Sequence, residues 1–309
     1  FLHPSQDRLS RGLATVAEEG QHLPAAWYTK PEPFSRERRK IFAETWLLLG
    51  RRAQLARPGD YLAVSIAGWP VLALADAGGA THAFRNVCRH QGLPIFDSGA
   101  GHCDRLRCRY HGWTYDFAGR FLTAPPASAP ADPADPGHGL ERIALAEGQG
   151  LMFVYLGRGD APPLAATAGL DLAPAGLRFQ AEPATDMMAN WKLAVERYLA
   201  LPAPAGVERF WRWPNLIVET SAAGVTLIAL VPRAFQRSLA VRYLFADAAL
   251  AAPALAARAE SDAERAQAVK AGAEADHAAL AAGACIAWAA SATLEDFRRR
   301  LRAVHDAAL

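Results

Sequence analysis

Residues 86–115, with the sequence NVCRHQGLPIFDSGAGHCDRLRCRYHGWTY, place four metal-ligand side chains in two mixed pairs. Cys88 and His90 form the first pair, and Cys108 and His111 form the second. One thiolate and one imidazole in each half suit a two-iron, two-sulfide cluster in which one iron takes both cysteines and the other takes both histidines. Neutral imidazoles give such a cluster a higher reduction potential than four thiolates do. The stretch therefore predicts a [2Fe–2S] centre that accepts an electron and passes it on.

The residues around the two pairs favour the same interpretation. Gly92 and Gly112 follow the histidines, where glycine lets the backbone turn tightly against a bulky cluster and aim its N–H groups at the sulfurs. Trp113 and Tyr115 are expected to shield the site from water. The alternatives are a single zinc ion, or four residues that bind nothing. Zinc sites usually pair Cys with Cys and His with His along the chain, and here each pair is mixed, which favours the cluster.

The two half-motifs, from Cys88 to His90 and from Cys108 to Trp113, resemble the cluster motif of the Rieske non-heme iron oxygenases. This family contains the alpha subunits of aromatic-ring hydroxylases and N-demethylases. The resemblance covers about residues 27–280. It implies a Rieske [2Fe–2S] cluster held by the same four side chains, and we expect these four to be the cofactor-binding and metal-binding residues of the chain.

The resemblance also implies an α+β fold with two domains. Residues 1–45 would form an N-terminal leader and helix, and residues 46–160 an antiparallel β Rieske domain. Residues 178–309 would form a degenerate catalytic-type domain, an antiparallel sheet with helices like that of the oxygenase catalytic domains. Apolar runs in the first domain predict strands at Tyr61–Ile66, Val71–Ala75, Leu140–Leu145 and Gly150–Leu156.

Apolar periodicity and capping residues predict three helices. The first runs through Ser35–Leu48 with one buried face. The second covers Ser261–Leu280, with Ser261 and Glu264 as a capping box at its start. The last begins at Ser291 or Thr293 as its cap. Its expected buried face consists of Leu294, Phe297, Leu301 and Val304.

The second domain departs from the family pattern at its iron site. The segment that begins at Asn190 resembles the start of the family's catalytic domain, where a helix contributes to a site of two histidines and one carboxylate around a mononuclear iron. Alignment without gaps places Ala200 at the bridging carboxylate, Ala203 at the first histidine and Glu208 near the second. Alanine has no donor atom, and two prolines at positions 202 and 204 break the helix.

The remaining candidate ligands are few. Asp276 falls where the family places its carboxylate ligand, and it is either a relic of that ligand or a solvated helix charge. Of the nine histidines in the chain, only His277 and His305 follow Trp191, and they are not at helical spacing. We therefore expect mononuclear Fe(II) to be absent, and no catalytic residue is assigned.

Composition limits the classes of partner. The 309 residues carry a net charge of +2 and are 51% hydrophobic, which gives no case for nucleic acid or an anionic membrane as a partner. Ala278–Leu294 is the longest apolar run, and its alanine-rich composition predicts a buried helix instead of a membrane span. Four cysteines, of which two are ligands, argue for a reducing compartment and a cytoplasmic location. Cys103 has no histidine partner at ligand spacing and is expected to be a small buried residue.

Three functions are consistent with the sequence. The first is a non-catalytic alpha-type subunit that relays electrons within a trimer-based hetero-oligomer, from a reductase or ferredoxin to the iron of a catalytic alpha subunit. The second is a self-sufficient Rieske monooxygenase or dioxygenase whose atypical iron site uses Glu208, Asp276 and His277. The third is a structural zinc-binding module. The sequence favours the first because the cluster motif is complete and the histidine pair is missing.

Overall fold

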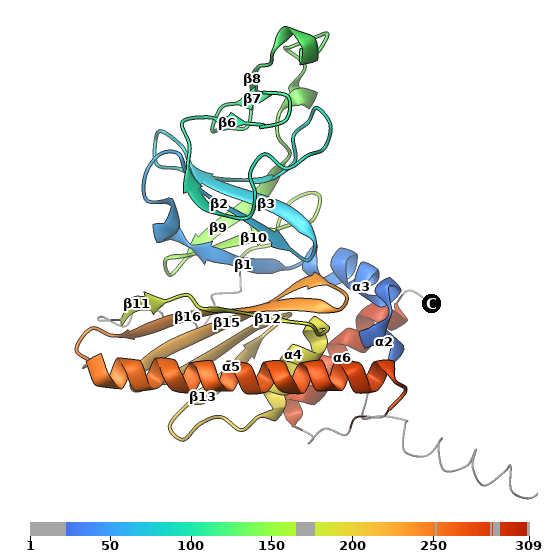
Figure 1. The fold of residues 1–309 in the computed structure, drawn as a ribbon, viewed down its shortest axis with the longest axis vertical. Helices are drawn as coiled ribbons and strands as arrows, with labels where there is room; N and C mark the ends of the chain where they lie inside the picture. The colour runs from blue at the N-terminus through green and yellow to red at the C-terminus, as the bar shows by residue number, and fades with distance from the viewer. Residues whose placement is uncertain (1–22, 165–176, 251, 285, 287–290, 308–309) are drawn as a thin grey trace, which may run out of the picture.

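The computed structural model describes residues 23–164, 177–250, 252–284, 286 and 291–307. Two antiparallel sheets are stacked, the first above the second, and a small three-stranded sheet forms the apex (Figure 1). Helices lie beside and below the second sheet. The predicted α+β class, with an antiparallel β domain followed by an antiparallel sheet with helices, is confirmed.

The first sheet has seven strands in the described residues, in the order β1-β10-β9-β4-β3-β2-β5. Its predicted strands form with shifts of one to three residues at their ends. The turn between β2 and β3 holds Ala67 and Gly68 at positive φ, which matches the twist of a tight hairpin. The strands are β1 (Trp46–Arg51), β2 (Asp60–Ile66), β3 (Trp69–Ala75), β4 (Thr81–Arg85), β5 (Gly99–His102), β9 (Arg142–Gly148) and β10 (Leu151–Tyr155).

The apex is built on short strands and turns. Its sheet has the order β6-β7-β8, with β6 at Leu106–Arg107, β7 at Thr114–Tyr115 and β8 at Phe121–Thr123. Two 3-10 turns, Pro126–Ser128 and Pro136–His138, follow in the proline-rich segment. Another 3-10 turn, Arg52–Leu55, links β1 to β2.

The second sheet has the order β11-β16-β15-β14-β13, and β12 also pairs with β16. Two long strands, β15 and β16, form its centre and pair over most of their length. The strands are β11 (Leu177–Ala181), β12 (Ala184–Met187), β13 (Glu208–Arg212), β14 (Leu216–Ser221), β15 (Gly224–Ala234) and β16 (Arg237–Asp247).

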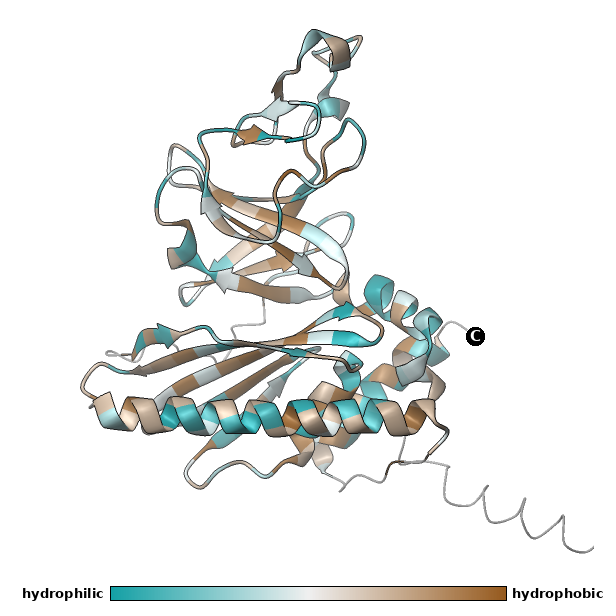
Figure 2. Ribbon diagram, viewed as in Figure 1, coloured by the Kyte–Doolittle hydropathy of each residue, from teal (hydrophilic) through white to brown (hydrophobic). Residues whose placement is uncertain are grey.

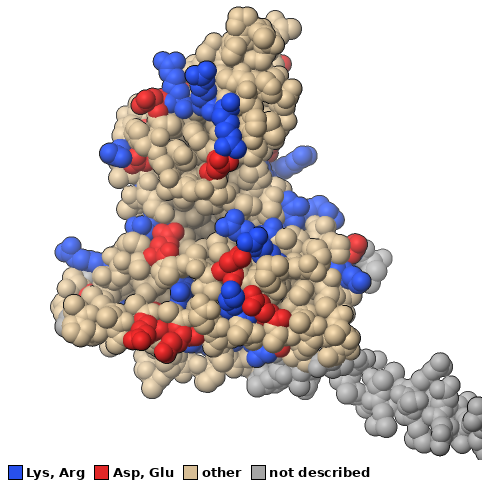
Figure 3. Space-filling view, viewed as in Figure 1, with Lys and Arg blue, Asp and Glu red and all other residues tan. Residues whose placement is uncertain are grey.

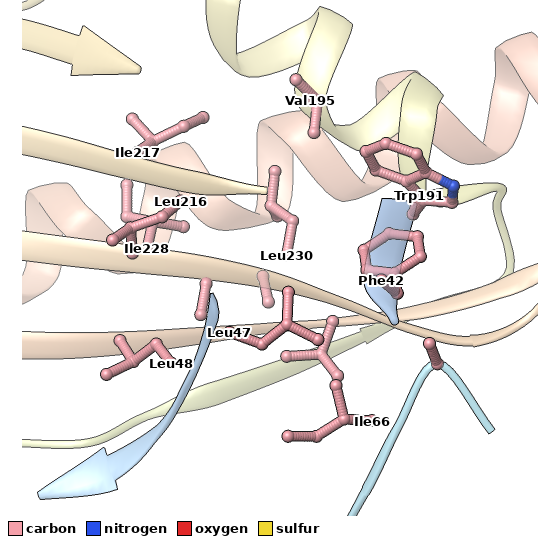
Figure 4. Close-up of a cluster of buried hydrophobic side chains, with 14 of the residues drawn as sticks. Phe42, Leu47, Leu48, Ile66, Trp191, Val195, Leu216, Ile217, Ile228 and Leu230 are labelled. Atoms are coloured by element: carbon pink, nitrogen blue, oxygen red, sulfur yellow. The ribbon is translucent and has the colours of Figure 1, made fainter. Parts of the chain in front are cut away.

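The two sheets share one apolar core. Leu47, Leu48 and Ile66 of the first sheet face Ile228 and Leu230 of the second across a continuous buried layer (Figure 4). The strands carry most of the hydrophobic residues in both sheets, whereas polar residues recur along α5 (Ala252–Ala281) (Figure 2). The first domain therefore rests on the second through buried apolar area, and the backbone N–H of Ala67 adds a hydrogen bond of 3.0 Å to the carbonyl of Pro232.

The predicted helix at Ser35–Leu48 is wrong in its second half. Helical turns run from α2 (Ala26–Thr29) through α3 (Pro31–Glu37) and a π-helical turn (Arg38–Phe42), and β1 then begins at Trp46. Four consecutive buried residues in β1 explain the difference, because a strand covered on both faces has no alternating pattern to distinguish it from a helix.

The predicted start of the long helix is also wrong, whereas its predicted end at Leu280 lies one residue from the observed end. Helix α5 is continuous over Ala252–Ala281, so Ser261 lies inside it and does not cap it. The alanine-rich residues before Ser261 have high helix propensity, which extends the helix toward its N-terminus. The buried helix predicted for Ala278–Leu294 is interrupted, because α5 ends at Ala281 and Gly283 turns the chain at a φ of +86°. Residues 285 and 287–290 of this range lie outside the part of the chain that the structure describes. No described helix combines the length and the apolar character needed to cross a membrane.

The two other helices of the second domain begin where the sequence indicates. In α4 (Trp191–Ala200) the Asn190 side chain accepts a hydrogen bond from the Lys192 backbone N–H, and the helix ends before the two prolines. In α6 (Ala292–Asp306) the Ser291 hydroxyl accepts from the backbone N–H of Leu294. Three of the four residues predicted for its buried face are fully buried, and Val304 is half-buried.

A buried polar cluster joins the N-terminal helices to α4 and α6. Glu37 is inaccessible to solvent and accepts hydrogen bonds from Lys192 Nζ at 2.7 Å and Trp191 Nε1 at 2.8 Å. His305 Nε2 lies 3.1 Å from the same carboxylate. Burial alone would raise the pKa of Glu37, but Lys192, His305 and Trp191 together hold it below its ordinary value. The carboxylate is therefore ionised and paired within the core.

A second buried carboxylate, Glu196, extends this polar cluster. It accepts hydrogen bonds from the Tyr28 hydroxyl at 2.9 Å and from Arg298 Nε at 2.8 Å. The ring of Trp27 stacks on that of His305 at 3.9 Å between centroids. Residues near both ends of the described chain are thus held against α4 by the same set of buried charges.

Candidate functional site

The two predicted ligand pairs lie on two turns of the same geometry. The backbone N–H of Cys88 donates to the Leu93 carbonyl at 2.8 Å, and that of Cys108 donates to the Trp113 carbonyl at 2.8 Å. In each turn the N–H of the glycine four residues after the cysteine donates back to the cysteine carbonyl, at 2.9 and 3.0 Å. Gly92 and Gly112 have φ values of +76° and +70°, the left-handed region that favours glycine.

The turns bring the four side chains together. The thiols of Cys88 and Cys108 are buried and lie close to each other. The imidazole rings of His90 and His111 lie 4.8 Å apart between centroids. The two sulfurs therefore lie on one side and the two imidazoles lie edge to face on the other, which is the division of ligands that a cluster with unequal irons requires.

Aromatic side chains enclose one side of this site. Trp113 is buried and stacks on His90 with 5.1 Å between centroids and an angle of 11°. The Tyr115 hydroxyl lies 3.2 Å from Cys88 Sγ and accepts a hydrogen bond of 3.0 Å from the Arg89 backbone N–H. His111 is exposed. The site is thus covered on the sides of Cys88 and His90 and open at His111.

The proline-rich segment after β8 supports the second turn. The sequence did not indicate this support. The Trp113 indole N–H donates to the Ser128 carbonyl at 2.7 Å, and the Ser128 hydroxyl donates to the His111 carbonyl at 3.1 Å. The ring of His138 packs edge-on against Trp113. No motif marks Ser128 or His138, because their partners are backbone groups and an aromatic ring that only the fold brings near.

Comparison with known proteins identifies the first domain. Residues 45–141 match the family model of the Rieske [2Fe-2S] domain. The glycine betaine monooxygenase oxygenase subunit of Chromohalobacter salexigens is 36% identical over 187 residues, which cover 58% of this chain and 41% of that relative. The chlorobenzene dioxygenase subunit alpha of a Cupriavidus species is 34% identical over 185 residues, 55% of this chain and 40% of that relative. Over the matched residues, this chain is similar to the alpha-type subunits of Rieske oxygenases, and residues 45–141 form a Rieske [2Fe-2S] domain.

Solved structures of Rieske oxygenases share the fold. The apo form of the quaternary ammonium Rieske monooxygenase CntA superposes with a TM-score of 0.77 at 18% identity, covering 92% of this chain and 95% of that one. Another structure of a quaternary ammonium Rieske monooxygenase, published with insights into inter-subunit electron transfer, gives a TM-score of 0.76 at 18% identity and covers 91% and 94% of the two chains. The matched part of the two curated relatives is less than half of their length.

The donor set of the Rieske domain fits a [2Fe–2S] cluster. His90 Nδ1 is buried and has no hydrogen-bond partner among the described residues, as expected of a nitrogen reserved for a metal. Within the described chain, no three His, Cys, Asp or Glu side chains group around one metal position. Two protein ligands per iron are what a binuclear cluster needs, whereas a lone zinc ion takes four ligands around one point. The chemistry of the donors therefore favours the cluster over zinc.

The hydroxyl of Tyr115 gives a testable contribution to this site. Burial raises the pKa of Tyr115, so its hydroxyl keeps a proton that it can donate to the sulfur of Cys88. A hydrogen bond to a thiolate ligand stabilises the reduced, more negative state. Replacing Tyr115 by Phe should lower the reduction potential by roughly 50–100 mV, the equivalent of one hydrogen bond to a charged group.

Redox titration of the Rieske spectrum measures this change. Tyr61→Phe is the matched control, because Tyr61 stacks on Phe96 in the same domain and, among the described residues, its hydroxyl forms no hydrogen bond with Cys88 or Cys108. An unchanged potential in Tyr115→Phe would show that the hydroxyl does not act on the cluster.

The other predicted site residues do not come together in the second domain. Ala200 is the last residue of α4, Ala203 is exposed in the following loop, and Glu208 is exposed at the start of β13. Asp276 and His277 are buried neighbours on α5. Glu208 therefore lies on the surface, while the two candidates on α5 point into the domain.

Asp276 is not a solvated helix charge, so that alternative is wrong. Its carboxylate pairs with the guanidinium of Arg197 on α4, with 2.5 Å between Nε and Oδ2 and a second bond from Nη2 to Oδ1. His277 is buried, and burial followed by the charge of Lys192 lowers its pKa, which favours the neutral ring. Arg197 could not be predicted as the partner of Asp276, because the two residues lie on different helices.

Proposed function

We propose that this chain is an alpha-type Rieske oxygenase subunit that relays electrons and has no mononuclear iron site of its own. The observation that carries the proposal is the contrast between the two domains. The Rieske domain assembles two thiols and two imidazoles, whereas the carboxylate of Asp276 is paired with Arg197 and positions 200 and 203 are alanines. The first domain therefore offers four ligands for a cluster, whereas the candidate carboxylate ligand of the second domain is already paired with an arginine.

The open side of the Rieske domain suits electron exchange. When bound, a cluster of this kind accepts and releases one electron at a time. His111 lines a hollow of about 510 Å³ at the apex, together with Arg107, Arg109, Tyr110 and Ser128. Tyr110 is 46% exposed and adds apolar area beside the imidazole. An exposed ligand edge surrounded by Arg and Tyr, residue types enriched in protein interfaces, is suited to pack against a partner.

We propose a catalytic alpha subunit as the partner at this apical hollow, within a trimer-based hetero-oligomer that receives electrons from a reductase or ferredoxin. The inter-subunit electron transfer described for a quaternary ammonium Rieske monooxygenase of the same fold supports this arrangement. In such an assembly the exposed edge of His111 would face the iron of the neighbouring subunit.

A self-sufficient oxygenase is the second candidate. The relatives favour it, because those named above are a monooxygenase oxygenase subunit and a dioxygenase alpha subunit. In this chain, His277 Nδ1 is buried without a hydrogen-bond partner among the described residues, and Asp276 precedes it on α5. An iron at this place would have to displace Arg197 from Asp276.

Metal analysis of the purified chain distinguishes the candidates. The relay subunit should contain two irons and two sulfides, and Asp276→Asn should leave both numbers unchanged, because Asp276 binds Arg197 and no metal. Three irons to two sulfides in the wild-type chain, falling to two in Asp276→Asn, would establish the oxygenase instead. A colourless protein that contains zinc would refute both, because the Rieske cluster absorbs visible light.

A further inference from the structure

A second hollow lies on the side of the Rieske domain and shares no lining residue with the apical hollow. Its volume is about 740 Å³, and residues from the N-terminal helices, the β2–β3 hairpin and the ends of β4 and β10 line it. Among them are four arginines, Arg39, Arg85, Arg89 and Arg158, and two glutamates, Glu44 and Glu141. We call it the side hollow.

The side hollow has an excess of positive charge. Glu44 is engaged by Lys40, with 3.6 Å between Nζ and Oε1, and Glu141 lies 3.7 Å from Arg85 Nε. Neither Arg39 nor Arg158 forms an ion pair with a described carboxylate, and both side chains are exposed. Lys and Arg side chains project beside the N-terminal helices where they adjoin the Rieske domain (Figure 3). An incoming carboxylate would therefore meet unpaired guanidinium groups.

The guanidinium of Arg85 lies at the wall of this hollow, where contacts with its neighbours hold its positive charge in place. Its Nη2 donates to the Leu156 carbonyl at 2.7 Å, and its guanidinium lies 5.3 Å from the centroid of the Trp69 ring. Burial lowers the pKa of Arg85, and the charge of Arg158 lowers it further while Glu141 opposes this. A negative group bound in the hollow would relieve that repulsion.

The side hollow also reaches the ligand Cys88. Arg89, which lines it, donates its backbone N–H to the Tyr115 hydroxyl at 3.0 Å, and this hydroxyl lies 3.2 Å from Cys88 Sγ. Two short contacts thus link the wall of the hollow to a thiolate ligand. This chain of contacts from the side hollow ends at Cys88, whereas the apical hollow opens at His111.

We propose that the side hollow is the docking surface for an acidic electron-transfer protein, which inserts carboxylate side chains between Arg39 and Arg158. The inference rests on the proposed function, because it requires a cluster in the Rieske domain. One electron passes from the reduced carrier, which is oxidised, to the cluster, which is reduced, and no other reactant is consumed. Entry at the side hollow leaves the His111 edge free for the catalytic partner.

The test uses the holoprotein and a plant-type [2Fe–2S] ferredoxin as an acidic carrier, whose potential lies below that of Rieske centres. The variant is Arg39→Glu with Arg158→Glu. The control, Arg105→Glu with Arg120→Glu, changes the net charge by the same amount at two exposed residues of the apex that line neither hollow. Binding of the oxidised ferredoxin is measured by calorimetry at low and high salt. Reduction is followed by stopped flow, with methyl viologen radical cation as a reductant that needs no acidic docking.

The expected result is that the side-hollow variant binds ferredoxin at least 10-fold more weakly at low salt and loses most of the salt dependence of binding. Its reduction by ferredoxin slows by a similar factor, whereas methyl viologen reduces it as fast as the wild type. The apical control stays within about twofold of the wild type for ferredoxin binding.

Three results would overturn the proposal. They are an unaffected side-hollow variant, a larger loss in the apical control, and no salt-dependent binding of ferredoxin to the wild-type chain. Binding of inorganic phosphate in the side hollow without any effect on ferredoxin would indicate a small-anion site instead. Failure of the proposed function is recognised separately, because a chain without a cluster shows no Rieske absorption and is not reduced by methyl viologen.

Discussion

Replacing Cys108 by serine should leave a chain that binds almost no iron. In the proposed cluster Cys108 would supply one of two thiolates for the same iron. Its backbone holds the second turn through hydrogen bonds to Trp113 and Gly112. Serine keeps those backbone contacts but offers a hydroxyl, which is a poor ligand for iron in this setting. Iron should fall from two atoms per chain to nearly none, with loss of the visible spectrum, while the far-ultraviolet circular dichroism is retained.

Cys103→Ser is the matched control for this prediction. Cys103 is partly buried in the same domain, and burial raises the pKa of its thiol to about 11, so it stays protonated at neutral pH. It should lose no iron. Full iron and an unchanged Rieske spectrum in Cys108→Ser would remove Cys108 from the ligand set, and equal losses in both variants would mean that the domain simply tolerates no change at its cysteines.

Replacing Lys192 by methionine should lower the free energy of unfolding by about 3–5 kcal/mol, because it leaves the buried carboxylate of Glu37 without its cation. Both side chains of this pair are inaccessible to solvent. Methionine fills a similar volume, so the loss comes mainly from charge and not from a cavity. Chemical denaturation of the purified chain, followed by circular dichroism, measures the effect.

An exposed ion pair of the same residue types gives the control. Lys40 and Glu44 lie one helical turn apart with side chains that are 63% and 53% exposed, and Lys40→Met should change stability by less than about 0.5 kcal/mol. The double variant Lys192→Met with Glu37→Gln should recover part of the loss, because it removes the uncompensated charge. A loss in Lys192→Met no greater than in Lys40→Met would show that Glu37 is satisfied by Trp191 and His305 alone.

The shape of the two turns in the first domain could be predicted from the sequence better than the architecture around them. The spacing of Cys88, His90, Cys108 and His111 defines two short turns, and local hydrogen bonds make each turn, so little else is needed to foresee their shape. The strands β2 and β3 were also predictable, because they flank a tight turn. By contrast, the first residues of β1 fall within a predicted helix, since a strand buried on both faces shows no alternation.

Long-range pairing explains what the sequence did not indicate. In the sequence, Asp276 is typical of a charged residue on the surface of a helix. In the fold it pairs with Arg197 of α4, which lies 79 residues away along the chain. Ser128 lies in a segment of prolines without a motif, and its contact with His111 depends on how that segment folds back. Such partners carry no local signal, because each residue alone is compatible with a solvated surface position.

The buried polar cluster has a consequence for the order in which the chain is made. Glu37 precedes its partners Lys192 and His305 by 155 and 268 residues, so its carboxylate stays hydrated while the Rieske domain emerges from the ribosome. The cluster-binding domain can thus acquire its iron before the N-terminal helices have a place to dock. Translation through α6 then provides the last of their partners. Docking of the N-terminal helices against α4 and α6 is therefore a late event in the biogenesis of this protein.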